Sequence, residues 1–176
     1  YNRIDIRKLE RRIRMLRKGH DNEKSKIIAI IGIAGTTETG NVDDLESLAE
    51  IAAETGAFFH VDASWGGPAL LVNEYRPLFK GIEKADSVAF DSHKLLYCPM
   101  SMGVALFRSE KDLNLIKHTS RYVIRRNSVD TGRFTVEGSR PFACLKPWAS
   151  LKIMGRDGYG LLFQHAREST EYFKSI

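Results

Sequence analysis

A strand–helix–strand succession within residues 26–62 constrains the fold of this chain more than any other feature. Residues 26–34, KIIAIIGIA, predict a fully buried strand, and residues 57–62, AFFHVD, predict a second one. Between them, residues 43–55, DDLESLAEIAAET, predict a helix. Strands separated by a helix at this spacing are typical of a parallel sheet with crossover helices. The sequence therefore predicts an α/β fold with a mostly parallel sheet.

The helix predicted at 43–55 has one apolar face and two recognisable ends. Asp43 is well placed to cap its N-terminus. Gly56 follows its last residue, where glycine commonly ends a helix. The apolar face consists of Leu45, Leu48, Ala49 and Ala52.

The rest of the chain continues this alternation and then becomes helical. The other predicted elements are a helix at 4–18, strands at 86–90 and 103–107 that pair with each other, a short helix and a long loop within 111–135, and helices at 141–154 and 158–174. The sequence GRDG separates the last two helices. The change from strands to helices near residue 136 is a candidate domain boundary.

Composition excludes several classes of protein. The longest apolar run, 27–34, is far shorter than the roughly 20 residues that span a bilayer, so no membrane association is expected. The first residues are charged and show no secretory signal pattern. Cys98 and Cys144 cannot form a disulfide scaffold and show no metal-ligand spacing. We therefore expect a cytoplasmic protein without a metal site.

The net charge of +5 is concentrated at the start of the chain. Residues 1–24 hold nine Lys and Arg against four Asp and Glu, which accounts for the whole surplus. The basic residues alternate with apolar ones at helical spacing, so they predict the solvated face of an amphipathic helix. The alternative is a noncatalytic basic interaction module that uses Arg11, Arg12 and Arg14. No aromatic residues interleave with these charges, so nucleic acid is not an expected partner.

Polar clusters follow three of the predicted strands. They are Gly35-Thr36-Thr37, Asp62-Ala63-Ser64 and Asp91-Ser92-His93-Lys94. Ligands of open parallel sheets bind beyond the carboxyl ends of the strands. The clusters therefore predict one shared site.

Lys94 and Asp62 carry the most specific chemistry of these clusters. Apolar residues surround Lys94 in sequence and favour the neutral amine that Schiff-base chemistry requires. A carboxylate such as Asp62 can keep a pyridine ring protonated, which makes the ring of pyridoxal phosphate an electron sink. The alternatives are a lysine that reaches solvent and an aspartate that forms a helix cap or a structural salt bridge.

The other polar residues allow two interpretations. Thr36 and Thr37 can bind a cofactor or simply form the turn. His93 can position a ligand or be a satisfied core residue. Ser64 and the glycines that follow it indicate a close backbone approach, which is common where a ligand contacts the chain.

Two motifs together resemble a known family. The sequence FFHVDASWGG, followed by ADSVAFDSHKLLYCPMSMGVALF with its lysine 32 residues after Asp62, is similar to the group II pyridoxal-phosphate-dependent amino-acid decarboxylases. The preceding GIAGTTETGNVDDL also resembles a turn of that family. The resemblance implies a three-layer fold of the PLP-dependent transferase-like type (fold type I). It further implies a homodimer and a division into part of the cofactor-binding large domain, residues 1–135, and helices that lead into a small domain, residues 136–176.

The resemblance implies a cofactor role for five residues. Lys94 would bind pyridoxal 5'-phosphate covalently and act in catalysis. Asp62 would pair with the pyridine nitrogen, and Thr37 would contact the cofactor. Ser64 would pack against the ring, and His93 would help to position the cofactor.

Four further residues have weaker correspondences. Tyr122 falls near a mobile-loop tyrosine that donates a proton in the family. Gly138 and Ser139 match a segment that reaches the phosphate of the neighbouring subunit. Asp91 stands where many members have asparagine, and it would repel a phosphate dianion unless a bridging donor intervenes.

The activity implied by the resemblance is decarboxylation of an L-amino acid, glutamate-like, diaminobutyrate or aromatic, to the amine and carbon dioxide. Another reaction on the same fold, such as that of an aminotransferase, desulfurase or carbon–carbon lyase, is the alternative. Members of the family are considerably longer than this chain, which therefore corresponds to a fragment of them.

Overall fold

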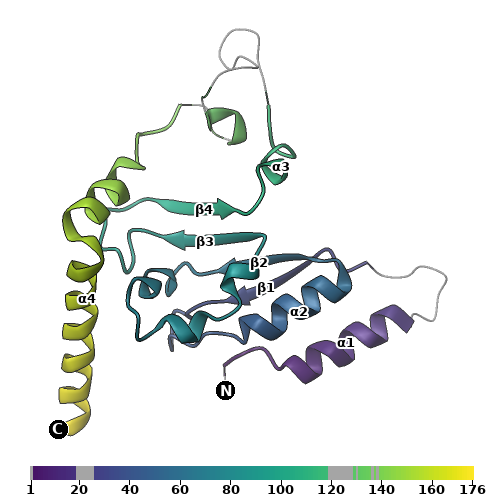
Figure 1. Cartoon of the computed structure of the whole chain (residues 1–176), viewed down its shortest axis with the longest axis horizontal. Coiled ribbons are helices and arrows are strands. Elements are labelled where there is room, and N and C mark those ends of the chain that lie inside the picture. The colour runs from purple at the N-terminus through teal and green to yellow at the C-terminus, as the bar shows by residue number, and fades with distance from the viewer. Residues whose placement is uncertain (1, 19–25, 119–128, 130, 136, 138) are drawn as a thin grey trace.

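The computed structural model describes residues 2–18, 26–118, 129, 131–135, 137 and 139–176. Its centre is a four-stranded sheet with the order β1-β2-β3-β4 (Figure 1). The strands are β1 (Ala29–Ile33), β2 (Phe58–Asp62), β3 (Ser87–Asp91) and β4 (Gly103–Phe107). The first three are parallel, and β4 runs antiparallel to β3. The predicted α/β class, the mostly parallel sheet and the pairing of the last two strands are confirmed.

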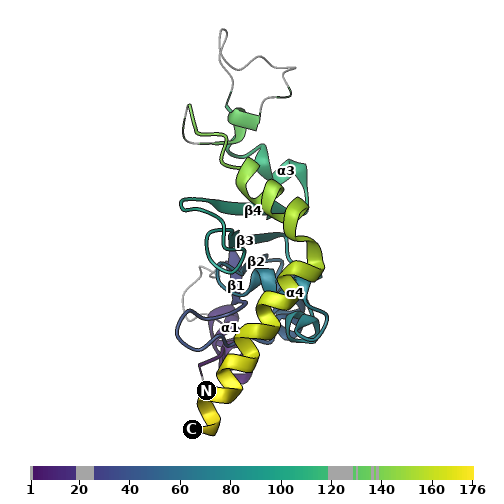
Figure 2. The ribbon, with the colours of Figure 1, turned by 90° about the vertical axis from the view of Figure 1, so that its left-hand side faces the viewer.

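Two of the helices cover one face of the sheet, and the longest lies beyond the ends of its parallel strands. They are α1 (Ile6–Lys18), α2 (Leu45–Thr55), α3 (Glu110–Leu113) and α4 (Leu145–Ser175). Short 3₁₀ helices occupy 67–71, 76–79, 82–84 and 131–134. Figures 1 and 2 show α2 against the sheet with α1 outside it, and α4 beyond the end to which β3 points. None of the helices in the described part of the chain is long and apolar enough to cross a membrane.

The core lies between α2 and the sheet. All four residues of the predicted apolar face are buried: Leu45, Leu48, Ala49 and Ala52. Gly32 of β1 allows the helix to approach closely, since a Cβ there would lie 2.8 Å from Leu45 Cδ2. The tight packing of α2 thus fixes the position of β1, which leads into the first polar cluster.

The ends of α2 confirm one prediction and correct another. Gly56 ends the helix in the left-handed conformation, with φ of 66°. The N-cap is Asp44, not Asp43, because the Asp44 side chain accepts from Ser47 N. Asp43 is buried instead, and its two carboxylate oxygens each accept at 2.8 Å, from the backbone N of Ile4 and of Ile33. It ties the N-terminal segment to β1.

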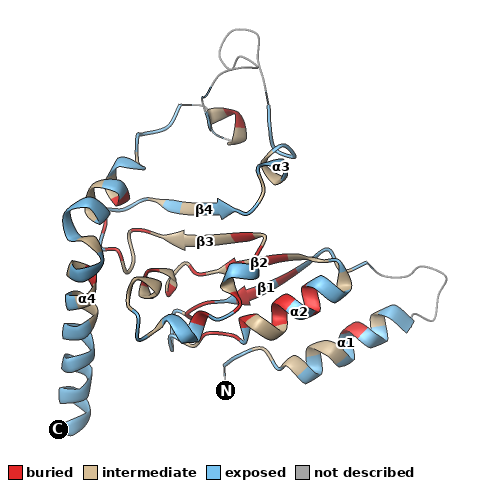
Figure 3. Ribbon diagram, viewed as in Figure 1, coloured by how far each residue is buried: buried red, intermediate tan, exposed pale blue. Residues whose placement is uncertain are grey.

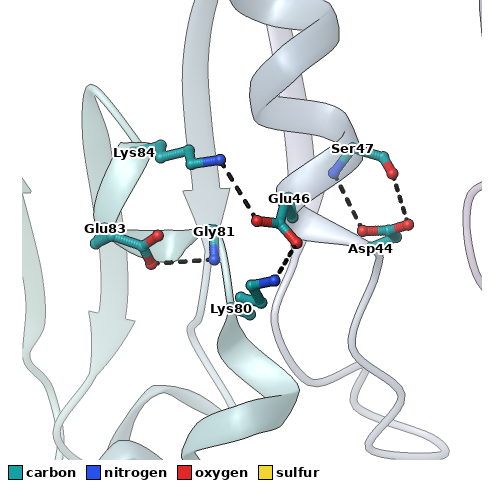
Figure 4. A network of polar contacts seen from close by, with 7 residues as sticks. All are labelled: Asp44, Glu46, Ser47, Lys80, Gly81, Glu83 and Lys84. Atoms are coloured by element: carbon teal, nitrogen blue, oxygen red, sulfur yellow. Dashed lines mark hydrogen bonds and ion pairs between the residues drawn. The ribbon is translucent and has the colours of Figure 1, made fainter.

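An ionic network holds the start of α2 against the chain that leads into β3 (Figure 4). Glu46 lies 2.8 Å from Lys80 Nζ and 3.6 Å from Lys84 Nζ. The hydrogen bond from Lys80 is the main reason that the pKa of Glu46 is lowered. Between these lysines, Gly81 has φ of +99°, and a Cβ there would lie 2.4 Å from Glu46 N. Only glycine fits without strain where the chain at residue 81 passes the backbone of Glu46.

The opposite face of the sheet is open. On β1, residues alternate between exposed and buried, and Ile31 and Ile33 are 54% and 38% exposed. Figure 3 shows that burial is concentrated in β1, β2 and the side of α2 that faces them, whereas β4 and α4 are largely exposed. The residues of β2 that alternate with the buried Phe59 and Val61 are His60 and Asp62, so these two face the open side.

The C-terminal helical region bends where the sequence predicts a break. Gly155 has φ of 59° and ψ of −171°, so α4 consists of two helical segments joined at this residue. The second segment is anchored by Tyr159, which is 1% exposed and donates to the Leu96 carbonyl at 2.9 Å. The domain boundary near residue 136 stays a prediction.

Candidate active site

The ends of the three parallel strands meet, as the sequence predicts. Ile33 pairs with Asp62 in the sheet, and Asp62 pairs with Ala89. Beyond the strands, Asp91 N donates to Ser64 O at 3.3 Å, which joins the second polar cluster to the third. The three clusters therefore lie together at the carboxyl ends of the parallel strands, which are called the sheet edge below.

The close backbone approach predicted around Ser64 occurs within the chain itself. Gly66 N donates to Ala34 O at 3.1 Å. A Cβ on Gly66 would lie 2.3 Å from Ala34 O, and a Cβ on Gly35 would lie 2.8 Å from Gly66 Cα. These glycines thus bring the Thr36–Thr37 turn against the turn that follows Asp62.

Asp62 is held as a carboxylate by its neighbours. Partial burial alone would raise the pKa of Asp62, but the hydrogen bonds from Ser64 Oγ and Ser64 N, together with the charges of His60 and Lys94, outweigh it and lower the pKa. Ser64 Oγ lies 2.5 Å and Ser64 N lies 3.0 Å from the same oxygen, Oδ1. Asp62 is therefore ionised at neutral pH and can accept a proton or a hydrogen bond from a cationic ring.

Lys94 lies in the turn after β3 and pairs with Asp91. Its Nζ is 3.0 Å from Asp91 Oδ2, and the two side chains are 29% and 25% exposed. The positive charge of Lys94 also contributes to the lowered pKa of Asp62. The amine and the carboxylate singled out from the sequence thus belong to the ends of neighbouring parallel strands.

The other predicted residues have distinct environments. His93 Nδ1 lies 3.1 Å from the Met102 carbonyl and 3.4 Å from Met102 N, which links the lysine turn to the start of β4. Thr36 is occupied by the turn, since its Oγ1 contacts Thr39 and accepts from Asn41 N. Thr37 is exposed in the same turn and is the better placed of the two threonines for a ligand.

Three predicted residues belong to the chain that follows residue 118, most of which lies outside the described residues up to residue 138. Tyr122 and Gly138 lie outside the described residues. Ser139 is exposed in the segment that leads to α4. Their assigned roles stay predictions.

Two residues near the site were not singled out from the sequence. His60 Nδ1 lies 2.7 Å from Ser87 Oγ on β3, and the strand period of two places His60 on the same face as Asp62. That spacing could have indicated it. Ser92 is fully buried, and its Oγ has no hydrogen-bond partner within the described part of the chain. No sequence pattern distinguishes this serine from a turn residue.

The donor set fits pyridoxal phosphate. The aldehyde of pyridoxal phosphate forms a covalent bond with a primary amine, which Lys94 supplies. Its protonated ring nitrogen is stabilised by an ionised carboxylate, which Asp62 supplies. Both belong to the edge of a parallel sheet where ligands of α/β proteins bind. The fold and this edge define a pyridoxal-phosphate enzyme of fold type I.

The chain belongs to the family described as the pyridoxal-dependent decarboxylase conserved domain, which matches residues 3–176. It is 41% identical over 175 residues to an aspartate 1-decarboxylase of Aliivibrio fischeri, covering 99% of this chain and 31% of the relative. It is 30% identical over 166 residues to an L-2,4-diaminobutyrate decarboxylase of Acinetobacter baumannii, covering 89% of this chain and 32% of that protein. The predicted family and its cofactor are confirmed.

Solved structures support the same assignment. A crystal structure of mouse CSAD superposes with a TM-score of 0.85 at 34% sequence identity, covering 98% of this chain and 36% of that one. The chain spans about a third of the length of the curated relatives that it matches. The prediction that it corresponds to part of a longer family member agrees with these proportions.

Proposed function

We propose that the natural polypeptide that carries this sequence removes the α-carboxylate of an amino acid as carbon dioxide, with pyridoxal phosphate bound at Lys94. The observation that supports this most directly is that the Asp62 carboxylate and the turn that carries Lys94 lie at the ends of the neighbouring parallel strands β2 and β3, joined by the hydrogen bond from Asp91 N to Ser64 O. When bound, the cofactor accepts the electron pair that remains when the carboxylate leaves. The chain's own residues bind and orient it.

Asp62 keeps the ring nitrogen protonated. Its lowered pKa leaves it anionic at neutral pH, and the two bonds from Ser64 fix the orientation of the carboxylate. Ser64 therefore acts on the ring through Asp62 in addition to its predicted packing role. Thr37 and His93, from the first and third clusters, would contact the cofactor from the same ends of the strands.

The remaining predicted roles form part of the same proposal. Tyr122 donates the proton that replaces the lost carboxylate. Gly138 and Ser139 approach the phosphate held by a second copy of the chain, so the working form is a homodimer. Residues 1–135 belong to the large domain, and residues 136–176 lead into the small one. Cys98 and Cys144 are free thiols, which agrees with a cytoplasmic location.

The substrate is an L-amino acid with an anionic or amine-bearing side chain. The supporting relatives are named for aspartate, L-2,4-diaminobutyrate and cysteine sulfinic acid. An aromatic-L-amino-acid decarboxylase of Bacillus atrophaeus is 31% identical, which keeps aromatic substrates in the test panel.

Borohydride reduction followed by peptide mass mapping tests the cofactor site. We expect a pyridoxyl group on Lys94, absent in Lys94→Ala and present in the control Lys152→Ala, which changes an exposed lysine of α4. A label on a different peptide would contradict the assignment. Measuring carbon dioxide against keto acid over the panel then separates decarboxylation from transamination.

A further inference from the structure

The ion pair between Lys94 and Asp91 is more enclosed than a surface pair. Nζ and Oδ2 are 3.0 Å apart, and both side chains are less than a third exposed. The pair Lys174–Glu171 on α4 has the same spacing of three residues, but its side chains are 66% and 64% exposed. The Lys94–Asp91 pair is therefore the less screened of the two.

The fold fixes the position of the Asp91 carboxylate. Asp91 is the last residue of β3, and alternation along the strand places it on the same face as Ser87, which contacts His60. This is the face of Asp62. Opposite Asp91 on β4 stands Gly103, where a Cβ would lie 3.3 Å from Asp91 Oδ1. The missing side chain leaves room for the carboxylate at the sheet edge.

The backbone fixes the other end of the pair. Lys94 N donates to the Asp91 carbonyl at 3.3 Å, and Asp91 N donates to Ser64 O at 3.3 Å. The turn that carries Lys94 is thus tied to the turn that carries the partner of Asp62. A lysine side chain is flexible, so without a partner its Nζ would sample many positions around this fixed turn.

We propose that Asp91 is a positioning residue for Lys94: its carboxylate holds the free amine at the sheet edge, on the side of Asp62, whenever no covalent bond holds it there. This inference rests on the proposed function of Lys94. It gives Asp91 a role other than binding the cofactor's phosphate, which a carboxylate would repel. It also explains why an aspartate is compatible with this site.

Cofactor uptake by the cofactor-free natural protein tests the proposal. In the covalent step the ammonium of Lys94 loses one proton to solvent, and the neutral amine then forms a C=N bond with the aldehyde carbon, while the aldehyde oxygen takes the two remaining nitrogen hydrogens and leaves as water. The rate of this step is followed by stopped-flow absorbance after mixing with pyridoxal phosphate. Equilibrium binding of pyridoxamine phosphate, which has no aldehyde and needs no lysine, measures the pocket separately.

Asp91→Asn keeps the size of the side chain and removes its charge. We expect covalent uptake to slow about fivefold, while pyridoxamine phosphate binds as in the unchanged protein. Gly103→Ala keeps both charges and crowds the carboxylate of Asp91. Its rate of covalent uptake should therefore lie between those of the unchanged protein and Asp91→Asn. Glu171→Gln, which breaks the exposed pair of equal spacing, should leave both measurements unchanged.

Three outcomes would overturn the inference. They are an unchanged rate in Asp91→Asn, a faster rate, and an equal loss of pyridoxamine phosphate binding, which would assign Asp91 to the cofactor pocket. Failure of the proposed function is recognised separately, because the unchanged protein would then form no covalent bond at Lys94. Gly103→Ala keeps the question testable should Asp91→Asn not fold.

Discussion

Ser64 gives both its hydroxyl and its backbone N–H to a single oxygen of Asp62, at 2.5 and 3.0 Å. Burial of Asp62 favours the neutral acid, and these two bonds are the largest of the effects that reverse it. Two residues separated by a single position in sequence thus decide the charge of the carboxylate at the end of β2.

Ser64→Ala should raise the pKa of Asp62, because one of the two bonds is lost while the burial remains. We expect pyridoxal phosphate to bind about fivefold more weakly, the effect of one ordinary hydrogen bond. Isotope-edited NMR of the Asp62 carboxyl carbon would measure the pKa, and titration would measure the affinity. Ser47→Ala is the matched control, since Ser47 gives its hydroxyl and N–H to Asp44 at the N-cap of α2. It should reduce stability without changing cofactor affinity.

The lowered pKa of Asp62 makes stability depend on pH in acid. A carboxyl group whose folded-state pKa lies below its ordinary value of 3.8 stabilises the fold fully at pH values above 3.8. That contribution disappears as the pH falls through the folded-state pKa. Denaturant unfolding from pH 7 to pH 2 should show this loss, and Asp62→Asn should lack it. A variant curve parallel to the original throughout would refute the prediction.

Gly81→Ala should destabilise the protein by about 3 kcal/mol. The new side chain meets Glu46 N at 2.4 Å, and φ of +99° adds strain for any residue with a Cβ. Gly40→Ala separates the two effects, because Gly40 has φ of +67° and nothing within 4 Å of its Cβ position. We expect it to cost about 1 kcal/mol. Equal losses of stability in the two variants would show that the contact between residue 81 and the backbone of Glu46 adds no strain.

Tyr159→Phe should cost about 1–2 kcal/mol. It leaves the Leu96 carbonyl without the donor that lies 2.9 Å away, in a place where Tyr159 is only 1% exposed. Tyr172→Phe on the same helix is the control, since Tyr172 is 67% exposed. Thermal unfolding of both variants checks the difference. Equal melting temperatures would mean that Tyr159 does not anchor α4.

The strand succession and the lysine turn could be predicted because local patterns specify them. The apolar runs at β1 and β2 predict strands, and the glycine after α2 predicts the end of that helix, whereas the prediction that β1 is fully buried is wrong because one of its faces is exposed. The choice of Asp44 over Asp43 as the cap could not be predicted, because either residue can cap and tertiary contacts to Ile4 and Ile33 decide which does. The identity of the N-cap thus depends on hydrogen-bond partners far apart in sequence, which local sequence patterns do not reveal.

The candidate site shows the same division. Asp62 and Lys94 could be predicted because Asp62 ends one strand and Lys94 follows another in a parallel sheet, where ligands bind beyond the carboxyl ends of the strands. The partner of Asp91 could not, since the sequence alone leaves open whether an acid three residues before a lysine pairs with it. The absence of a side chain at Gly103, across the sheet, completes the space for that pair. The sequence around Asp91 does not indicate that a glycine lies opposite it on the neighbouring strand.

Gly66→Ala should weaken cofactor binding by separating two of the turns at the site. Gly66 has φ of −82°, so alanine brings no backbone strain, and the whole effect comes from a Cβ that would lie 2.3 Å from Ala34 O. The turn of Thr36 and Thr37 must then move away from the turn after Asp62.

We expect Gly66→Ala to bind pyridoxal phosphate at least tenfold more weakly, measured by titration, and to lose about 2 kcal/mol of stability, measured by denaturant unfolding. Gly160→Ala, in open space on α4, should keep the affinity and slightly raise stability, because alanine favours helix. Unchanged affinity in Gly66→Ala would show that the contact between the two turns does not shape the site.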